Sequence, residues 1–265
     1  MKKIVALLMA ALIAVLSVFS LASCNSSGSD LDQVKKNGKL VVGVTVYEPM
    51  DYVDSETGEW AGFDADLAKM FAESLGVNVQ LVIINWNNKV SELKSNQIDL
   101  IWNGMTASDE LGQEIDFSLA YAKNAQVAVV KKGSTITKDT LKNASVAVEN
   151  GSAGEDVATD VVGVSTLIEN NDGQVGALNE VRAGTADACI IDITMAESVL
   201  GKGDYTDLEV LEGATYGEEV FAVGLRPGSD IKAELDAFLK EMYDNGTLAE
   251  LAEKYSVSIN SAAFN

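Results

Sequence analysis

The chain has 265 residues, with 40 acidic against 19 basic side chains and a formal net charge of −21. Such an excess of acid excludes nucleic acid as a natural partner, because binding a phosphate backbone needs clustered Lys and Arg. The chain also contains no histidine, the side chain that most often serves as general base and as metal ligand. Neither metal nor catalytic-triad chemistry is therefore expected, and no cofactor is predicted.

The amino terminus has the pattern of a secretion signal. Lys2 and Lys3 precede an apolar run over residues 4–18, and small residues follow before Cys24. A signal-anchor helix is the weaker alternative, because the run is short for a span of roughly 20 residues. The tetrad "LASC" resembles the lipobox of bacterial lipoproteins, which implies a signal peptide over 1–23, lipid on Cys24 and a lipidated linker over 24–37. Several acyl chains together would make a stable membrane anchor.

The remaining cysteine and the charge agree with that interpretation. If Cys24 carries lipid, Cys189 has no partner for an internal disulfide. Its setting, "DACIID", is typical of a small buried hydrophobe rather than of a nucleophile. The negative charge of the chain disfavours direct attraction to anionic head groups, so the lipid would be its only membrane contact.

Apolar runs of strand length alternate with stretches of helical period in the first half of the chain. Strands are predicted at residues 39–46, 79–84 and 99–104. Helices are predicted after them, at residues 62–76, 88–96 and 108–115. This βαβ repetition predicts a parallel sheet flanked by helices.

A second set follows "YAKNAQVAVVKKG", residues 121–133. Strands are predicted at residues 145–151, 164–169 and 187–192. Helices are predicted at residues 152–160, 172–185, 194–201 and, near the carboxyl terminus, 229–246. Two α/β lobes fit this length and order better than one large sheet does.

The ends of the predicted strands carry the candidate binding residues. In open α/β sheets, ligands bind beyond the carboxyl ends of strands, where helix amino termini present free N–H groups. Those ends hold Tyr47, Trp86, residues 103–108, residues 149–153 and Asp192. They combine two aromatic rings, hydroxyl groups, glycine backbone and two acids, which suits a small polar ligand.

Several segments, in order, resemble the polar amino-acid family of solute-binding proteins that serve ABC importers. They include "GFDADLAKMFAESLG", "DLIWNGMTASDE", "VRAGTADACIID" and "YDNGTLAELAEKY", and the resemblance covers residues 39–256. It implies a periplasmic-binding-protein-like α/β fold of two lobes, each a mostly parallel sheet flanked by helices, joined by two hinge strands. The implied divisions are lobe 1 at 38–120 plus 222–258, lobe 2 at 126–216, and hinges at 121–125 and 217–221.

The resemblance assigns three residues to the ammonium and side chain of a ligand. Tyr47 and Trp86 match the aromatic residues that sandwich the ligand, and Asp192 matches the acid that takes its α-ammonium. Simpler roles are open for two of them. Trp86 could pack against the surface of its lobe, and Asp192 could cap the helix that starts near Thr194.

The resemblance assigns three further residues to polar contacts with the ligand. Gly104 and Thr106 match the backbone and hydroxyl contacts to its carboxylate, and Ser152 matches a hydroxyl at the start of a lobe 2 helix. Thr106 and Ser108 could instead cap a helix.

The chain departs from the family pattern at Leu111. Members usually carry an arginine there, whose planar fork grips the carboxylate. The only arginines of the chain, Arg182 and Arg226, are not placed to replace it. Glu149 adds a second acid near Asp192. The carboxylate contacts are therefore weakened while the contacts for a cation are strengthened.

Two ligand classes stay open from the residues. An aromatic pair with two acids suits a cationic amino acid or an amine, through cation–π attraction and ion pairing. Alternatively, the ligand is an ordinary polar amino acid whose carboxylate meets backbone N–H groups, Thr106, and Lys89 or Lys123. A cationic solute that is not an amino acid is a further alternative.

The predicted function is capture of this solute outside the cytoplasm and its delivery to the permease subunits of an ABC importer, by a lipid-anchored monomer. An enzyme of the same fold, a dehydratase of aromatic-precursor acids, would have only Glu149 as a suggestive proton donor. A sensory module would need a further span or signalling domain. A purely structural surface lipoprotein would not need the strand-end aromatic residues and acids.

Replacing the lipidation site tests the predicted anchor. Cys24→Ser removes the thiol at the signal boundary, so the variant should leave the membrane fraction and be released in soluble form. Fractionation and immunoblotting measure this. A variant that stays in the membrane fraction would show that residues 4–18 act as an anchor helix.

Overall fold

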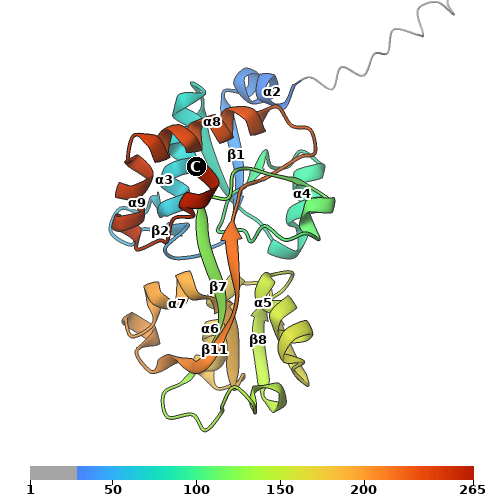
Figure 1. The fold of residues 1–265 in the computed structure, drawn as a ribbon, viewed down its shortest axis with the longest axis vertical. Helices are drawn as coiled ribbons and strands as arrows, with labels where there is room; N and C mark the ends of the chain where they lie inside the picture. Colours follow the sequence, from blue (N-terminus) through green and yellow to red (C-terminus); the bar gives the residue numbers. More distant parts are fainter. Residues whose placement is uncertain (1–28) are drawn as a thin grey trace, which may run out of the picture.

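Two five-stranded sheets organise residues 29–265, the part of the chain that the computed structural model describes. Figure 1 shows them as two lobes, one above the other, joined by long strands. The predicted signal peptide 1–23, Cys24 and the first residues of the predicted linker lie outside the described residues. Within residues 29–265, no helix combines the length and apolarity needed to cross a membrane.

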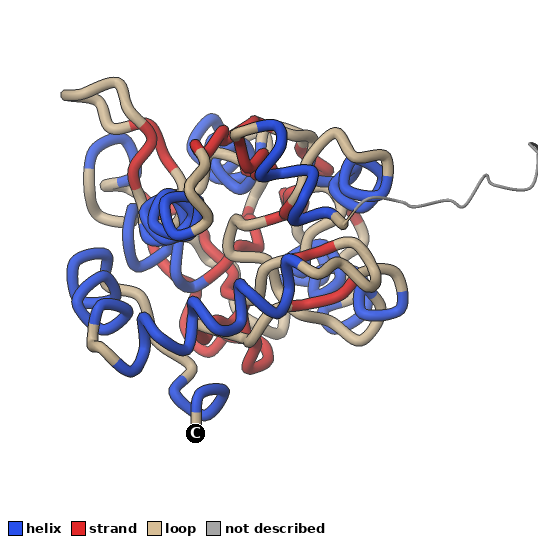
Figure 2. The backbone as a smooth tube through the Cα atoms, turned by 90° about the horizontal axis from the view of Figure 1, so that it is seen from above, coloured by secondary structure: helices blue, strands red, loops and turns tan. Residues whose placement is uncertain are grey.

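The first lobe has strand order β4-β1-β5-β12-β6. Its strands are β1 (Lys39–Val44), β4 (Asn78–Ile83), β5 (Leu100–Ile101), β6 (Asp116–Phe117) and β12 (Gly224–Leu225), beside a small hairpin of β2 (Tyr52–Val53) and β3 (Trp60–Ala61). Its helices are α2 (Asp30–Asn37), α3 (Phe63–Ser74), α4 (Lys89–Lys94), α8 (Ile231–Asp244) and α9 (Thr247–Tyr255). Figure 2 shows helices on the outside and strands toward the middle.

The second lobe has strand order β11-β7-β10-β8-β9. Its strands are β7 (Ala122–Lys131), β8 (Ser145–Glu149), β9 (Thr166–Asn170), β10 (Ala188–Asp192) and β11 (Leu208–Phe221). Its helices are α5 (Ala153–Asp156), which continues as a π-helix over Val157–Val162, α6 (Gly173–Ala183) and α7 (Ile193–Val199).

The predicted α/β fold class is confirmed, and the antiparallel pairs within it have a topological cause. The βαβ units pair in parallel, as β1 does with β4 and β5, and β8 with β9 and β10. Apart from the small β2–β3 hairpin, the antiparallel pairs involve the crossing strands β7 and β11 or their neighbours β6 and β12. A chain that leaves one lobe and later returns must run against the βαβ strands at these positions.

Strands β7 and β11 connect the lobes and pair with each other in antiparallel register. The predicted hinges 121–125 and 217–221 fall on these two strands. The register shifts between Tyr216 and Glu219, and such an irregularity bends a strand locally. Near the carboxyl terminus, Ile259 also bridges to Ala122, so the tail lies beside the start of β7.

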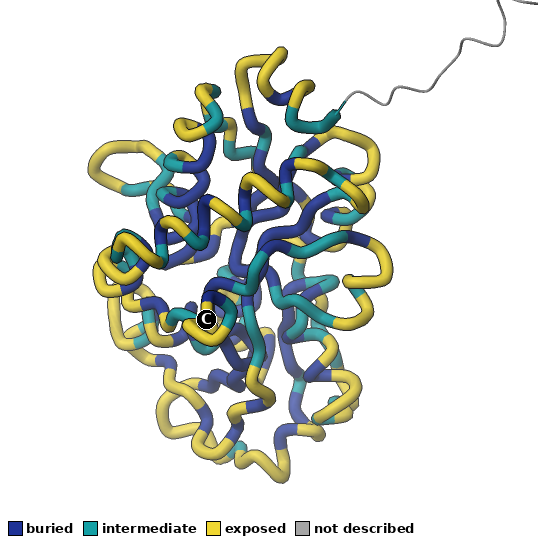
Figure 3. The backbone as a smooth tube through the Cα atoms, turned by 45° about the horizontal axis from the view of Figure 1, so that its top comes forward, coloured by how far each residue is buried: buried dark blue, intermediate teal, exposed yellow. Residues whose placement is uncertain are grey.

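Aromatic side chains fill the core of the first lobe. Phe71 of α3 packs against Trp102, with ring centroids 6.3 Å apart, and against Phe238 of α8 at 5.3 Å. Phe63 stacks on Tyr121 at 6.1 Å. Figure 3 shows buried segments through the middle of the molecule and exposed segments around its outside. The apolar residues of α3, among them Phe63, Leu67 and Phe71, thus face this core.

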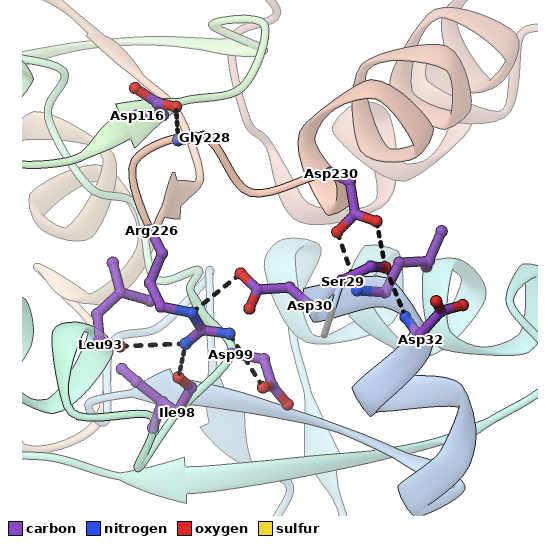
Figure 4. Close-up of polar contacts among 11 residues, drawn as sticks. Ser29, Asp30, Asp32, Leu93, Ile98, Asp99, Asp116, Arg226, Gly228 and Asp230 are labelled. Carbon is purple, nitrogen blue, oxygen red and sulfur yellow. Dashed lines mark hydrogen bonds and ion pairs between the residues drawn. The ribbon is translucent and has the colours of Figure 1, made fainter. Parts of the chain in front are cut away.

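The second half of the predicted linker is a helix, which corrects the predicted boundary. Helix α2 covers Asp30–Asn37, and Ser29 caps it by accepting a hydrogen bond from Asp32 N at 2.9 Å. Gly38 ends the helix with a left-handed φ of 68°. Asp230 accepts hydrogen bonds from the Ser29 hydroxyl and from Leu31 N, which fixes this cap to the first lobe (Figure 4).

The predicted helix over residues 108–115 is also wrong. The segment forms only a 3₁₀ turn at Leu111–Gln113. Ser108 Oγ accepts from Leu111 N at 3.2 Å, so Ser108 caps the turn. Gly112 in the middle of so short a segment disfavours a full helix.

One arginine ties three segments of the first lobe together (Figure 4). Arg226 donates to the carbonyl oxygens of Ile98 at 2.7 Å and Leu93 at 3.1 Å. It also pairs with Asp30 at 3.0 Å and Asp99 at 3.4 Å. Its side chain is only 13 % exposed, so these partners depend on it for hydrogen bonds.

Removing this arginine should destabilise the protein and release α2. Arg226→Met leaves two carbonyl oxygens and two partly buried acids without their cation, a loss of about 2–4 kcal/mol. Urea denaturation should show the loss, and hydrogen exchange should rise in Asp30–Asn37.

The other arginine of the chain provides the control. Arg182 pairs with Asp204, whose side chain is 74 % exposed, so Arg182→Met should cost at most about 1 kcal/mol. Equal losses in the two variants would contradict the role of Arg226.

Candidate functional site

All eight predicted ligand-binding residues line one cavity between the lobes. Its volume is about 210 Å³, below the roughly 300–1,000 Å³ typical of pockets for drug-sized ligands. The predicted residues that line it are Tyr47, Trp86, Gly104, Thr106, Leu111, Glu149, Ser152 and Asp192. The sequence therefore predicted which strand ends meet, and the cavity suits a ligand of about amino-acid size.

The two aromatic residues come from the first lobe. Tyr47 is buried and meets Phe221 edge to face, with ring centroids 6.4 Å apart. Its hydroxyl group has no hydrogen-bond partner among the described residues. Burial, followed by the charge of Asp192, raises the pKa of Tyr47 well above its ordinary value. An unpartnered buried hydroxyl that lines a cavity is available to a ligand.

Trp86 packs within its lobe, as the simpler of its two predicted roles requires, and its contact with a ligand stays a prediction. It packs in a cluster with Leu93 and Ile98 of the first lobe, and it also lines the cavity. It lies in a 3₁₀ turn, Trp86–Asn88, whose first residue follows the cap Asn85. The packing therefore fixes the ring at the edge of the cavity.

Lys89 places an ammonium group in the site. Its Nζ lies 4.9 Å from the centroid of the Trp86 ring and donates to the carbonyl oxygen of Gly151 at 2.8 Å. It thus links the first lobe to the second. Burial lowers the pKa of Lys89, and the charge of Glu149 opposes this shift. Lys123, the other lysine considered from the sequence, is exposed and does not line the cavity.

Asp192 is held by three amide side chains. Its Oδ1 accepts from Gln126 Nε2 at 2.6 Å and from Asn124 Nδ2, and its Oδ2 accepts from Gln174 Nε2. It precedes α7, but its side chain makes no capping hydrogen bond. The simpler role as a helix cap is therefore wrong. Burial is the main cause that raises its pKa to about 6.

Glu149 is a buried acid with an unused oxygen. Only 4 % of the residue is exposed, and Oε1 has no hydrogen-bond partner among the described residues. Burial, then the charge of Asp192, raises the pKa of Glu149 to about 8, while Lys89 opposes the shift. A buried carboxylate oxygen without a donor is costly, and a ligand that donates to it would relieve that cost.

The backbone N–H of Gly104 is already occupied. It donates to Asp64 Oδ2 at 2.6 Å, and Tyr121 donates to the same oxygen at 2.8 Å. Asp64 is fully buried, and burial raises its pKa to about 7. Gly104 has a φ of +54°, and a Cβ there would lie 2.6 Å from the Tyr47 ring, so only glycine fits. Its predicted contact with a ligand carboxylate cannot use this N–H.

The hydroxyl groups of Thr106 and Ser152 differ in whether their hydrogen is free for a ligand. Thr106 Oγ1 donates to Glu219 Oε2 at 2.9 Å, so its hydrogen is not free for a carboxylate. Ser152 Oγ accepts from Glu155 N at 3.3 Å, which makes it the cap of α5. Its own hydrogen has no acceptor among the described residues. Ser152 can therefore cap the helix and still donate to a ligand.

Leu111 lines the cavity from the 3₁₀ turn, at the place where the family pattern has an arginine. Neither arginine of the chain replaces it. Arg182 lies on α6 beside Asp204, and Arg226 lies in the interior of the first lobe. The cationic clamp for a carboxylate is thus absent from the cavity lining.

The lining is strongly acidic. Among the described residues it holds one cation, Lys89. The acids of the lining are Glu110, Glu114, Glu149, Asp156 and Asp192. Such a lining raises the local concentration of cations, and within residues 29–265 no group of acids is arranged to hold a metal ion.

Sequence reasoning missed two amides that line the cavity and a third beside it. Gln126 and Asn124 lie on β7, whose sequence is otherwise that of an apolar strand. Gln174 lies in the first turn of α6, just after β9. The strand-end rule, had it been applied to β9, would have indicated Gln174. Nothing in the local pattern indicates the two amides of β7.

These features define a two-lobed binding protein that encloses a small polar ligand at its hinge. The chain matches a family model over residues 40–258, and it belongs to the bacterial extracellular solute-binding proteins, family 3.

Relatives and solved structures of this kind bind several amino acids. The arginine-binding extracellular protein ArtP of Bacillus subtilis (strain 168) is 33 % identical over 261 residues, 96 % of this chain and 98 % of that protein. The L-cystine-binding protein TcyJ of Escherichia coli (strain K12) is 33 % identical over 232 residues, 85 % of each chain.

Among solved structures, the ancestral amino acid-binding protein AncCDT-1, a precursor of cyclohexadienyl dehydratase, has a TM-score of 0.78 at 29 % identity. The match covers 86 % of this chain and 99 % of that one. The arginine- and cystine-binding relatives are equally identical to the chain, so the cavity's own chemistry must decide the ligand.

The raised pKa of Glu149 predicts a pH dependence of stability. Its pKa rises from 4.5 to about 8 on folding, so the native state holds a proton that the unfolded state has lost. Stability from this group is complete below pH 4.5 and is lost as the pH rises to about 8, with a slope of up to ~1.4 kcal/mol per pH unit.

Glu149→Gln should remove this contribution. As the pH rises from 5 to 8, the unfolding free energy of the variant should increase relative to that of the parent. Denaturation at each pH measures this difference. Glu56→Gln removes the same charge from an exposed loop and should follow the parent. If Glu149→Gln also runs parallel to the parent, Glu149 is not protonated in the native state.

Proposed function

We propose that this protein captures a cationic amino acid outside the cytoplasm and delivers it to the permease subunits of an ABC importer. Family membership supports the transport role, and an arginine-binding protein is among its relatives. The choice of a cationic ligand rests on the cavity itself.

The unused oxygen of Glu149 is the observation that carries the choice of ligand. It is buried, lines the cavity and has no donor among the described residues. The Tyr47 hydroxyl group is in the same state. A guanidinium or ammonium group offers several hydrogens and a positive charge, which a neutral side chain cannot match beside five acids.

Two contacts remain for the carboxylate of an amino acid. Lys89 supplies a charge and Ser152 a free hydroxyl hydrogen, and both line the cavity. In this proposal Asp192 takes the α-ammonium group, Tyr47 and Trp86 enclose the side chain, and Glu149 meets its cationic end. An amine without a carboxylate would leave Lys89 and Ser152 unused.

We propose a binding protein rather than an enzyme. Glu149 is the one group of the cavity that suits a proton donor at neutral pH, since burial raises its pKa to about 8. A dehydratase of aromatic-precursor acids would have to hold a substrate with more than one carboxylate. The acidic lining and Leu111 in place of an arginine oppose such a substrate.

We further propose that the protein works as a lipid-anchored monomer at the bacterial surface, tethered through Cys24. The described chain begins at the cap of α2, which lies at the end of the first lobe away from the second lobe (Figure 1). A tether that enters there leaves the mouth of the cleft free.

Calorimetry with L-arginine, L-glutamine and putrescine tests the ligand class. L-arginine should bind at least about tenfold more tightly than L-glutamine, because a charged hydrogen bond at Glu149 is worth about 1.5–3 kcal/mol. Putrescine should bind more weakly than L-arginine, since it offers nothing to Lys89 and Ser152. Equal affinity for the two amino acids would contradict a cationic ligand.

A variant at Leu111 sharpens the same test. Leu111→Arg adds a contact to a carboxylate worth roughly 1.5–3 kcal/mol, offset by the cost of burying a guanidinium group. It should shift preference toward L-glutamine and weaken putrescine most. Leu111→Met keeps the volume without the charge and should resemble the parent. An unchanged profile in Leu111→Arg would mean that this position does not reach the ligand.

A further inference from the structure

A carboxylate outside the cavity lining gathers donors from the first lobe and from a crossing strand. Glu219 lies on β11, directly opposite Asn124 of β7. Its Oε2 accepts from Thr106 Oγ1 at 2.9 Å, from Gln126 Nε2 at 3.0 Å and from Asn124 Nδ2 at 3.1 Å. Thr106 belongs to the strand-end loop of the first lobe, so Glu219 joins that loop to the hinge.

The same two amides also hold Asp192 of the second lobe. Asn124 Nδ2 and Gln126 Nε2 each donate to Asp192 Oδ1 as well as to Glu219. An amide group has two hydrogens, so each can give one to either carboxylate. An unbroken path of hydrogen bonds therefore runs from Thr106 through Glu219 and the amides to Asp192.

This arrangement has a cost that a simple connection between lobes would avoid. Two carboxylates share the same pair of donors, and the charge of Glu219 contributes, after burial, to the raised pKa of Asp192. Apolar side chains at these positions would join the strands without this repulsion. The hinge carries the repulsion at the point where β11 changes register, between Tyr216 and Glu219.

A ligand ammonium group at Asp192 would remove part of that cost. With its charge met, Asp192 no longer repels Glu219, and the shared amides can strengthen their bonds to both acids, since hydrogen bonds in a chain reinforce one another. Glu219 in turn holds Thr106 of the first lobe. A ligand contact at Asp192 in the second lobe would thereby strengthen the hydrogen bonds that hold Thr106 in the first lobe.

We propose that Glu219 is a positioning residue that sets where Asp192 meets the ligand's ammonium group and couples that contact to Thr106 across the hinge. The inference rests on the proposed function only in taking an ammonium group as the ligand atom at Asp192. Glu219 itself does not touch the ligand, since it is not among the residues of the cavity lining.

The first test needs no ligand. Tyr47, Glu149 and Glu219 are the titratable groups that influence Asp192. Glu219→Gln keeps an acceptor oxygen and removes the charge, so NMR titration should place the Asp192 pKa lower by roughly half a unit or more. Glu218→Gln removes the same charge from the exposed neighbouring residue and should leave it in place. An unchanged Asp192 titration in Glu219→Gln would overturn the link.

The second test measures coupling with L-arginine as the probe. Glu219→Met removes the acceptor and should weaken binding by about fivefold or more, while Glu218→Met should not. Thr106→Val should weaken binding in the parent by about threefold and have no further effect in Glu219→Met. Thr106→Ser keeps the hydroxyl group and should restore parental affinity. Additive losses of Thr106→Val and Glu219→Met would overturn the coupling.

The two tests separate this inference from the proposed function. If the parent does not bind L-arginine, the proposed ligand is wrong, and the titration of Asp192 still decides whether Glu219 acts on it. If L-arginine binds and Glu219→Met leaves its affinity unchanged, the proposed ligand stands and the role of Glu219 is overturned.

Discussion

Burial of carboxylates between the lobes, in a cleft whose described lining holds one cation, is the constraint on which the rest of the site depends. Each ionised acid removed from water costs free energy unless donors replace its hydration. Asp192 has such donors in three amide side chains. Among the described residues, the buried Oε1 of Glu149 accepts no hydrogen bond, and burial raises the pKa of this acid to about 8. The two acids therefore differ in their hydrogen bonding and in their protonation. Asp192 is surrounded by hydrogen-bond donors, while the raised pKa of Glu149 favours its protonated form at neutral pH.

The same constraint shapes the first lobe, where internal acids use up the donors that would otherwise serve a carboxylate ligand. Asp64 takes the N–H of Gly104, and Glu219 takes the hydroxyl of Thr106. With Leu111 at the position of the arginine, three of the contacts expected for a carboxylate are unavailable. Asp64 is fully buried, so a donor removed from it would leave a buried polar group unsatisfied, and this cost holds the loop at Gly104 in place. With these donors occupied, the site offers few contacts to a carboxylate and has an excess of negative potential.

Periodicity and strand order predicted the two lobes and the strand ends that meet, because both follow from where apolar residues fall along the chain. Tyr47, Trp86, Glu149 and Asp192 were predicted on that basis with the family resemblance, and all of them line the cavity. The hydrogen-bond partner of each polar atom could not be predicted. The bonds from Thr106 to Glu219 and from Gln126 to Asp192 join residues far apart in sequence, and no local pattern encodes them. The cap of α2 was within reach, since Ser29 followed by Asp32 is a start signal; the turn at Leu111 depends on a cap and a glycine within a few residues.

Lys89 is the source of positive charge among the described residues that line this site. Its ammonium group occupies one face of Trp86 and bridges to Gly151 in the second lobe, so it competes with a ligand cation for the ring and repels it. A diamine would face this repulsion with nothing in return. In the proposed binding mode, the carboxylate of an amino acid would pair with Lys89, and Asp192 and Glu149 would remain for its two cationic groups. Because burial already lowers the pKa of Lys89, a nearby carboxylate also stabilises its charged form. The charge pattern of the cavity therefore matches a molecule with one anionic and two cationic ends better than it matches a simple cation.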